Sequence, residues 1–257
     1  MPEIEDEIFE WAARLQHPSR YAPTLSVVSK RIQKRVEPII YETIKLSGSG
    51  ESFYNTSWYE QFQYTLRARP AEFFARNVIN MSITDRVPAE VTSEILSKCT
   101  GIRNLFVWLP LAPPRCDTFK LLLPFSSTLF SLTVSKDLLC YLAGSGYTFP
   151  LVTHLSITCY KDTRCPTLEW LPSLSSVELG LGNEPYYTEI WIQDVRTALS
   201  TAPLLKALQL RVVDDGYTLE HFAAPTLMRH PEGGDPRVSL DCYPDYFHWY
   251  NTFYKSY

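Results

Sequence analysis

The sequence predicts an α/β solenoid, in which irregular repeats each contribute one parallel strand, preceded by a small helical segment. Three observations predict this fold. The pattern apolar-x-x-apolar-x-apolar recurs along most of the chain, and its copies are spaced regularly. Some of the segments between copies carry apolar residues at helical spacing, and so do the first 40 residues.

The recurring pattern has seven copies, whose central residues are Ile44, Met81, Leu105, Leu132, Leu155, Val177 and Leu208. Successive central residues are separated by 37, 24, 27, 23, 22 and 31 residues. Leucine-rich repeats share this core pattern at a period of about 20–29 residues, and four of the six spacings lie in that range. Because one coil cannot bury its apolar side alone, we expect the coils to stack, with these side chains pointing inward. The alternative is a set of unrelated amphipathic strands.

Two connecting segments are predicted to be helices. Residues 88–98 carry Val91, Ile95 and Cys99 on one helical face, and residues 188–199 carry Trp191 and Val195 in the same way. The other connectors, such as 123–128 and 166–172, contain proline and are expected to be too short for a full helix.

The N-terminal 40 residues are predicted to be helical. Residues 1–15 place Ile4, Ile8, Trp11, Ala12 and Leu15 on one face and acidic residues on the other. Residues 24–46 read as two short helices running into the first strand, and Pro38 is expected to stop the second helix. So few short helices cannot form an independent core, so they need the solenoid or a partner to cover their apolar faces.

The C-terminal segment, about 243–257, is predicted to cap the last coil. Asp245 is placed to cap a short helix whose face carries Tyr246, Trp249, Tyr250, Phe253 and Tyr257. Such an aromatic face either packs over the last coil or binds a partner.

Composition narrows the class of protein. The 257 residues are 45% hydrophobic and 20% charged, with a net charge of −4, so a packed core is expected and a basic surface for nucleic acid is not. The longest apolar runs fall short of a membrane span, and the acidic N-terminus is unlike a targeting peptide. We therefore expect a cytoplasmic or nuclear protein that binds neither nucleic acid nor membrane.

No pattern for a metal, a cofactor or catalysis stands out. The six cysteines lack zinc-ligand spacing, and reduced thiols are favoured over a Cys159–Cys165 disulfide. GxSxG, HExxH, Walker and GxGxxG motifs are absent. No metal or cofactor is expected, and the sequence leans against an enzyme. Catalytic groups from distant positions would escape such a search, so an enzyme with an unrecognised active site remains the weakest alternative.

Several segments resemble one family. Residues 2–13 (PEIEDEIFEWAA) and 22–46 (APTLSVVSKRIQKRVEPIIYETIKL) resemble the F-box-like segment of a large group of basidiomycete fungal proteins. The leucine-rich-repeat body of that group is similar to residues 69–84, 95–110, 149–158 and 235–246. The resemblance covers nearly the whole chain and implies an F-box-like segment at 1–40 followed by a leucine-rich-repeat-like solenoid at 41–257.

The resemblance implies a function in protein degradation. In F-box proteins the N-terminal helices bind the Skp-type adaptor of a cullin–RING ubiquitin ligase, and the repeats hold a protein substrate. The chain is therefore expected to be a substrate-recognition subunit of a Skp–cullin–F-box ligase. Two positions depart from the usual F-box. The leading Leu-Pro is missing or replaced, since Met1-Pro2 stands before Glu3, and Ile32 follows Lys30-Arg31 where a tryptophan is common. The alternative is a repeat scaffold that binds a protein or a small molecule without recruiting a ligase.

The resemblance places any adaptor contact on apolar residues of the N-terminal helices. The expected contact residues are Pro2, Ile4, Ile8, Phe9, Leu25, Val28 and Ile32. The alternative is that these residues pack on the first repeat.

Alternation of side chains along each strand predicts the substrate surface. Residues flanking an inward apolar position face the other side of the sheet. The candidates for ligand or substrate binding are Asn104, Phe106, Trp108, His154, Tyr160, Glu178, Gln209 and Arg211. Small hydroxyl side chains between them would make a shallow groove with aromatic and charged ends. The alternative is a merely solvated face, or one covered by a helix or by the aromatic C-terminus.

Overall fold

The structure is a computed structural model that describes residues 2–15, 24–46, 58–84, 87–108, 119–159, 164–181, 188–213 and 235–243. The chain forms two compact units, Met1–Ile102 and Arg103–Tyr257. Strand order follows chain order, from β1 to β8, in an open sheet whose described pairings are all parallel. The predicted α/β class with parallel strands is confirmed.

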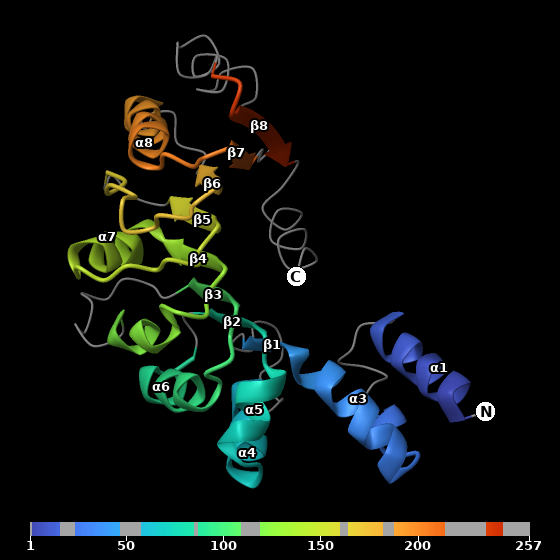
Figure 1. Ribbon diagram of the computed structural model, residues 1–257. Helices are drawn as coiled ribbons and strands as arrows, with labels where there is room; N and C mark the ends of the chain where they lie inside the picture. Colours follow the sequence, from blue (N-terminus) through green and yellow to red (C-terminus); the bar gives the residue numbers. More distant parts are fainter. Residues whose placement is uncertain are drawn as a thin grey trace. The chain divides into compact units, whose positions relative to one another are not determined.

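The first unit is mainly helical (Figure 1). Its elements are α1 (Pro2–Leu15), α3 (Lys30–Glu42), β1 (Thr43–Leu46), α4 (Trp58–Ala68), α5 (Ala71–Asn77), β2 (Asn80–Thr84) and α6 (Ala89–Lys98). β1 and β2 are parallel, with Ile44 opposite Met81. Helix α3 packs between α1 and α5. The expected N-terminal helix is confirmed, and a helix runs into the first strand as expected, with the junction between Glu42 and Thr43.

The predicted stop at Pro38 is wrong, because α3 continues through this proline to Glu42. Proline removes one backbone donor within the helix. The last turn instead gains from burial of Ile39 beside Val36, and this packing outweighs the missing hydrogen bond. The start of α3 is set by Ser29, whose hydroxyl accepts a hydrogen bond from the Ile32 amide at 3.2 Å. Only one helical turn, at residues 24–26, stands where a first short helix was expected.

The long 37-residue spacing between the first two strands contains helices α4 and α5. Their buried residues include Phe62, Leu66 and Phe74. The rings of Phe62 and Phe74 meet edge to face, with centroids 5.7 Å apart. The extra length of this spacing therefore holds two helices that contact each other.

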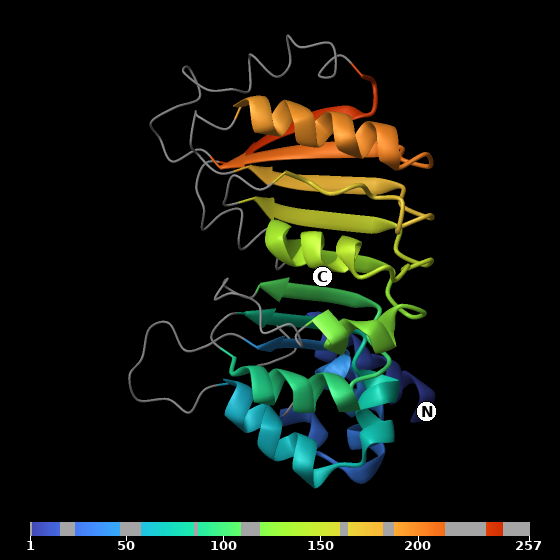
Figure 2. The same ribbon diagram turned by 90° about the vertical axis from the view of Figure 1, so that its left-hand side faces the viewer.

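The second unit carries the more regular part of the parallel sheet. Its elements are β3 (Asn104–Trp108), the 3₁₀ helix η1 (Phe119–Phe125), β4 (Ser131–Ser135), α7 (Lys136–Gly144), β5 (His154–Cys159), β6 (Ser176–Leu181), α8 (Thr188–Thr201), β7 (Ala207–Val213) and β8 (Val238–Tyr243). Figures 1 and 2 show η1, α7 and α8 on the same face of these strands. The expected helix at 188–199 is confirmed and extends two residues further. Helix α7 was not expected.

The predicted inward residues form one continuous apolar ladder in the second unit. Leu105, Leu132, Leu155, Val177 and Leu208 lie opposite one another in successive strands, and all five are buried. The ladder continues in β8, which the seven-copy search missed, with Val238 opposite Leu208. In the first unit Met81 is buried and Ile44 is half-buried. These parallel, in-register strands agree with a stacked-coil architecture.

Two leucines, one in strand β5 and one in the turn before it, allow a test of this ladder. Leu155 is 2% exposed in β5, whereas Leu151, four residues earlier, is 39% exposed. Leu155→Ala should lower the free energy of unfolding by about 2–5 kcal/mol, because it leaves a cavity in the ladder. Leu151→Ala is the matched control and should change it by less than about 0.5 kcal/mol in urea denaturation. Equal effects would contradict the assigned register.

A close backbone approach in the first unit gives a second test. A Cβ atom added to Gly101 would lie 1.9 Å from the carbonyl oxygen of Ala75 at the end of α5. Gly101→Ala must therefore push α5 away, and should lower the free energy of unfolding by about 1–3 kcal/mol. Gly144→Ala is the control, because an added Cβ there has no neighbour within 4 Å. Urea denaturation of both variants separates the steric clash from the general effect of losing a glycine.

Candidate functional site

Helix α1 has two apolar faces, and only one of them packs on α3. On the packed face, Phe9 and Ala13 contact a cluster formed by Ile32, Val36 and Ile39 of α3. The other face carries Ile4, Ile8 and Trp11, whose exposed fractions are 52%, 56% and 65%. Spacings of four and three residues put these side chains in one stripe along the helix. This stripe is an apolar surface that stays exposed to solvent in the structure.

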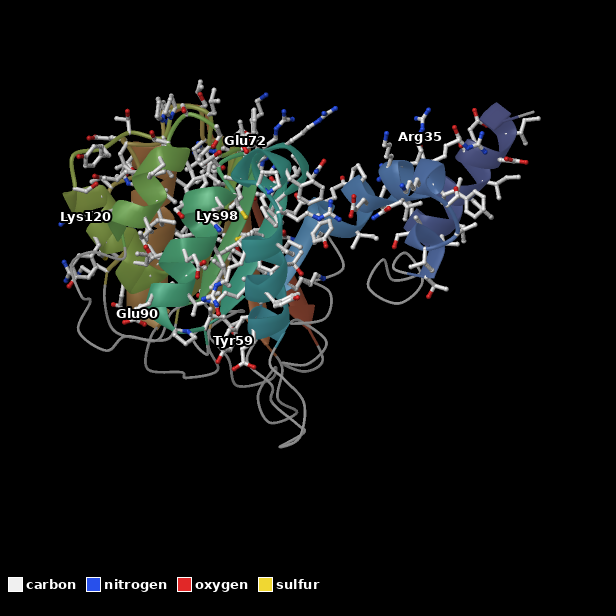
Figure 3. All side chains as sticks on the ribbon, turned by 90° about the horizontal axis from the view of Figure 1, so that it is seen from below. Arg35, Tyr59, Glu72, Glu90, Lys98 and Lys120 are labelled. Carbon is white, nitrogen blue, oxygen red and sulfur yellow. The ribbon has the colours of Figure 1, made fainter. Side chains whose placement is uncertain are left out.

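Ion pairs fix the orientation of α1 on α3. Arg31 reaches Glu5 at 2.6 Å and Asp6 at 3.5 Å, and Arg35 reaches Asp6 at 3.6 Å and Glu10 at 3.4 Å. Near the other end, Arg14 contacts Glu42 at 3.2 Å. The partners advance together along both helices, so α1 and α3 run parallel; Arg35 is labelled on α3 in Figure 3. Each exposed pair stabilises little by itself, but together they set which face of α1 turns outward.

The predicted adaptor residues divide into two groups. Ile4, Ile8 and Val28 are exposed. Phe9 and Leu25 are partly buried against the helix-pair cluster, and Ile32 is fully inside it. These three therefore stabilise the helix pair itself. The side chain of Pro2 lies outside the described residues.

Two further apolar residues, Trp11 and Val27, are exposed near Ile4, Ile8 and Val28, although they were not among the predicted adaptor contacts. Trp11 was predicted to lie on the apolar face of the N-terminal helix, but it was not among the predicted adaptor contacts. Val27, like Val28, is exposed just before α3. Because Arg31 contacts Glu5, these valines lie at the same end of the helix pair as Ile4. We call Ile4, Ile8, Trp11, Val27 and Val28 the helix-pair surface; it holds five of the eleven exposed large apolar side chains among the described residues.

A second candidate surface is the polar face of the sheet in the second unit. One row across the strands consists of Phe106, Thr133, Ser156, Glu178 and Gln209, each opposite the next. The neighbouring row toward the strand ends holds Ser135, Thr158, Gly180 and Arg211. Asn104 and His154 belong to the row on the other side, each opposite Ser131 of β4. Six of the eight predicted substrate residues are thus gathered on one face.

The polar face is more buried than the solvated groove that alternation predicts. Thr133, Ser156, Thr158 and Phe106 are all buried, whereas His154 is exposed. Within the part of the chain that the structure describes, the Ser156 hydroxyl is buried without a hydrogen-bond partner. Phe106 is therefore not a solvent-facing anchor. The side chain of Trp108, at the end of β3, and all of Tyr160 lie outside the described residues.

The charged residues of this face pair with each other. Arg211 Nη1 lies 2.9 Å from Glu178 Oε1, with both side chains mostly buried, and Arg211 Nη2 lies 3.5 Å from the Gln209 side-chain oxygen. The pair joins two adjacent strands, β6 and β7, and leaves the face with little net charge at this point. The arrangement suits hydrogen bonding to a polar, uncharged group better than binding of an ion.

On the opposite side of the sheet, a buried ion pair connects three separate segments. The Lys136 ammonium, at the first residue of α7, lies 2.5 Å from Asp194 Oδ2 in α8, and the two side chains are only 3% and 1% exposed. The other carboxylate oxygen, Oδ1, accepts a hydrogen bond from the Cys165 amide at 2.8 Å. A lysine at a helix N-terminus opposes the helix dipole, so Asp194 compensates locally. No local sequence pattern indicates this pair, because its members are 58 residues apart.

Burial makes two of the described thiols, Cys99 and Cys140, poor nucleophiles. It raises the pKa of the Cys99 thiol to about 12, and it also raises the pKa of Cys140. Both thiols stay protonated at neutral pH, and the thiolate is the reactive form. Within the described ranges, no group of three His, Cys, Asp or Glu residues is placed to hold a metal ion. None of the described helices is long and apolar enough to cross a membrane.

Comparison with known proteins gives no identification. No protein-family model matches the chain, and no curated protein matches it. The candidate surfaces therefore rest on the residues and their geometry.

Breaking the buried ion pair should be costly. Lys136→Met leaves the Asp194 carboxylate buried and unneutralised, and should lower the free energy of unfolding by about 3–5 kcal/mol. The double variant Lys136→Met, Asp194→Leu removes both charges and should be more stable than Lys136→Met alone. Urea denaturation measures both. A double variant as unstable as the sum of the two single changes would show that the charges do not interact.

Proposed function

We propose that the chain is the substrate-recognition subunit of a Skp–cullin–F-box ubiquitin ligase. In this proposal the helix-pair surface binds the Skp-type adaptor, and the repeats bind a protein substrate. The observation that carries it is the exposed apolar stripe of α1, Ile4, Ile8 and Trp11, opposite the face that packs on α3. A helix pair that has its own small core and still exposes a second apolar face is suited to docking on another protein.

The composition of the surface supports a protein partner. Large apolar side chains, with a tryptophan among them, supply most of the binding energy at many interfaces. Glu7 is exposed on α1 between Ile4 and Ile8, so a partner helix with basic residues beside its apolar ones would be complementary. The parallel, in-register strands of the second unit are compatible with the rigid repeat body that this role requires, which supports the proposal.

The alternative, a repeat scaffold that recruits no ligase, is favoured by one observation. Phe9, Leu25 and Ile32, three of the expected adaptor contacts, are used inside the helix pair. The remaining surface is therefore smaller than the seven-residue set predicted from sequence. Direct binding distinguishes the two functions.

The test is binding of the purified full-length chain to the Skp-type adaptor of the same organism by isothermal titration calorimetry. Ile8→Glu should weaken binding at least tenfold, because it places a charge in the apolar stripe. It should leave the thermal melt nearly unchanged, because Ile8 is exposed. Tyr64→Glu, at an exposed position of α4, is the matched control and should bind like the unmodified chain.

Phe9→Glu completes the series, because Phe9 is adjacent in sequence but packs against α3. It should lower the helical content and the melting temperature together with adaptor binding. If the unmodified chain does not bind the adaptor, or if Ile8→Glu binds as tightly, the ligase function is wrong and the scaffold alternative gains.

A further inference from the structure

The residues that immediately precede strands β3 to β7 form a rigid edge, which we call the strand-start rim. It consists of Arg103 and residues 127–130, 150–153, 172–175 and 203–206. The Phe130 carbonyl accepts hydrogen bonds from the amides of Thr153, at 2.9 Å, and His154, at 3.2 Å. The carbonyls of Arg103, Thr153 and Ser175 are used in the same way, so the rim is held at the spacing of the strands. Figure 2 shows this edge at the ends of the strands opposite the arrowheads.

Exposed apolar side chains lie along the rim, two of them in its interior turns and one, Leu204, in its last turn. Phe130, Leu151 and Leu204 are 42%, 39% and 56% exposed. Each of the two leucines follows an exposed proline, and a further exposed proline, Pro172, lies in the coil between them. Proline limits the backbone freedom of these turns, so the side chains are presented on a surface that loses little entropy on binding.

Each end of the rim is positively charged. Arg103 and Lys206 are both exposed, and the Arg103 guanidinium lies 6.0 Å from the ring centre of Phe130. Residues 127–130, 150–153, 172–175 and 203–206 contain no Asp or Glu. Arg103 precedes β3 and Lys206 precedes β7, so four strand spacings, about 19 Å, separate them. Further along, before β8, the charge of Arg237 is already matched by Asp235, 2.7 Å away.

We propose that the strand-start rim binds an acidic segment of a partner protein, with apolar residues at its centre and a carboxylate toward each end. Charge complementarity favours this occupant. The rim has a cation at each end and exposed apolar side chains along it, so it matches a segment with an acidic residue toward each end and apolar residues between them. An extended segment of about six residues spans the distance between the two cations. The site goes beyond the proposed function and does not depend on adaptor binding.

The experiment uses the full-length chain and two fluorescein-labelled synthetic peptides of eight residues. The acidic peptide has two glutamates, four leucines and two glutamates in order, and the control peptide has lysines in place of the glutamates. Fluorescence anisotropy should show at least tenfold tighter binding of the acidic peptide, weakening as salt is added. This preference would oppose the net charge of −4, which repels an acidic peptide.

Variants of the chain locate the site. Arg103→Glu, Lys206→Glu should weaken binding of the acidic peptide at least tenfold, and Leu204→Ala should weaken it severalfold. Arg164→Glu, at an exposed position away from the rim, is the control and should leave binding unchanged. Equal affinity for the two peptides, or an unaffected double variant, overturns the proposal. Tighter binding of a labelled single-stranded oligonucleotide than of the acidic peptide overturns it as well, in favour of a phosphate-binding edge.

Discussion

The in-register stacking of apolar residues across the parallel strands is the constraint on which the second unit depends. A single coil exposes too much apolar surface to be stable, and its neighbours supply the missing cover. Leu105, Leu132, Leu155, Val177, Leu208 and Val238 satisfy this requirement in a single row. A slip of one residue in any strand would turn its apolar residues to the wrong face, so this row fixes the register of the whole array. The register of the apolar row therefore also sets the positions of the polar side chains on the opposite face of the sheet.

One consequence is that residues far apart in sequence become neighbours at strand spacing. Glu178 and Arg211 form their ion pair because their strands are adjacent and Arg211 lies two residues beyond Gln209, the residue opposite Glu178, on the same face. The strand-start rim arises in the same way, since each of its turns precedes a strand of the array. On the helical side, the Lys136–Asp194 pair connects α7 to α8 and to the backbone of Cys165. A buried pair of this kind favours one arrangement of the connecting segments more than it adds stability.

The sequence predicted the strands better than the surfaces, for physical reasons. Strand positions repeat with the coils, so seven copies of one pattern were enough to align them. Helix α7 escaped because residues 136–144 begin directly after a strand, with no separate turn to mark them. The stop predicted at Pro38 was wrong because the burial of Ile39 offsets the hydrogen bond that proline removes from the helix. Only the fold reveals this burial. The Lys136–Asp194 pair has no local pattern at all.

The two faces of α1 show what helical periodicity can predict and what it cannot. Helical spacing correctly placed Ile4, Ile8 and Trp11 together, but it could not say whether that stripe or the one containing Phe9 and Ala13 would pack on α3. In the structure Glu5, Asp6 and Glu10 pair with Arg31 and Arg35 while the Phe9 side of α1 packs on α3, so the ion pairs and the apolar packing favour the same orientation. Such exposed pairs are weak individually, but together they favour the arrangement in which the stripe of Ile4, Ile8 and Trp11 stays outside. The contacts that orient the helix therefore also define the surface available to a partner. A partner that competed for Arg31 and Arg35 would disturb the helix pair, whereas one that used only the outer stripe would leave it intact.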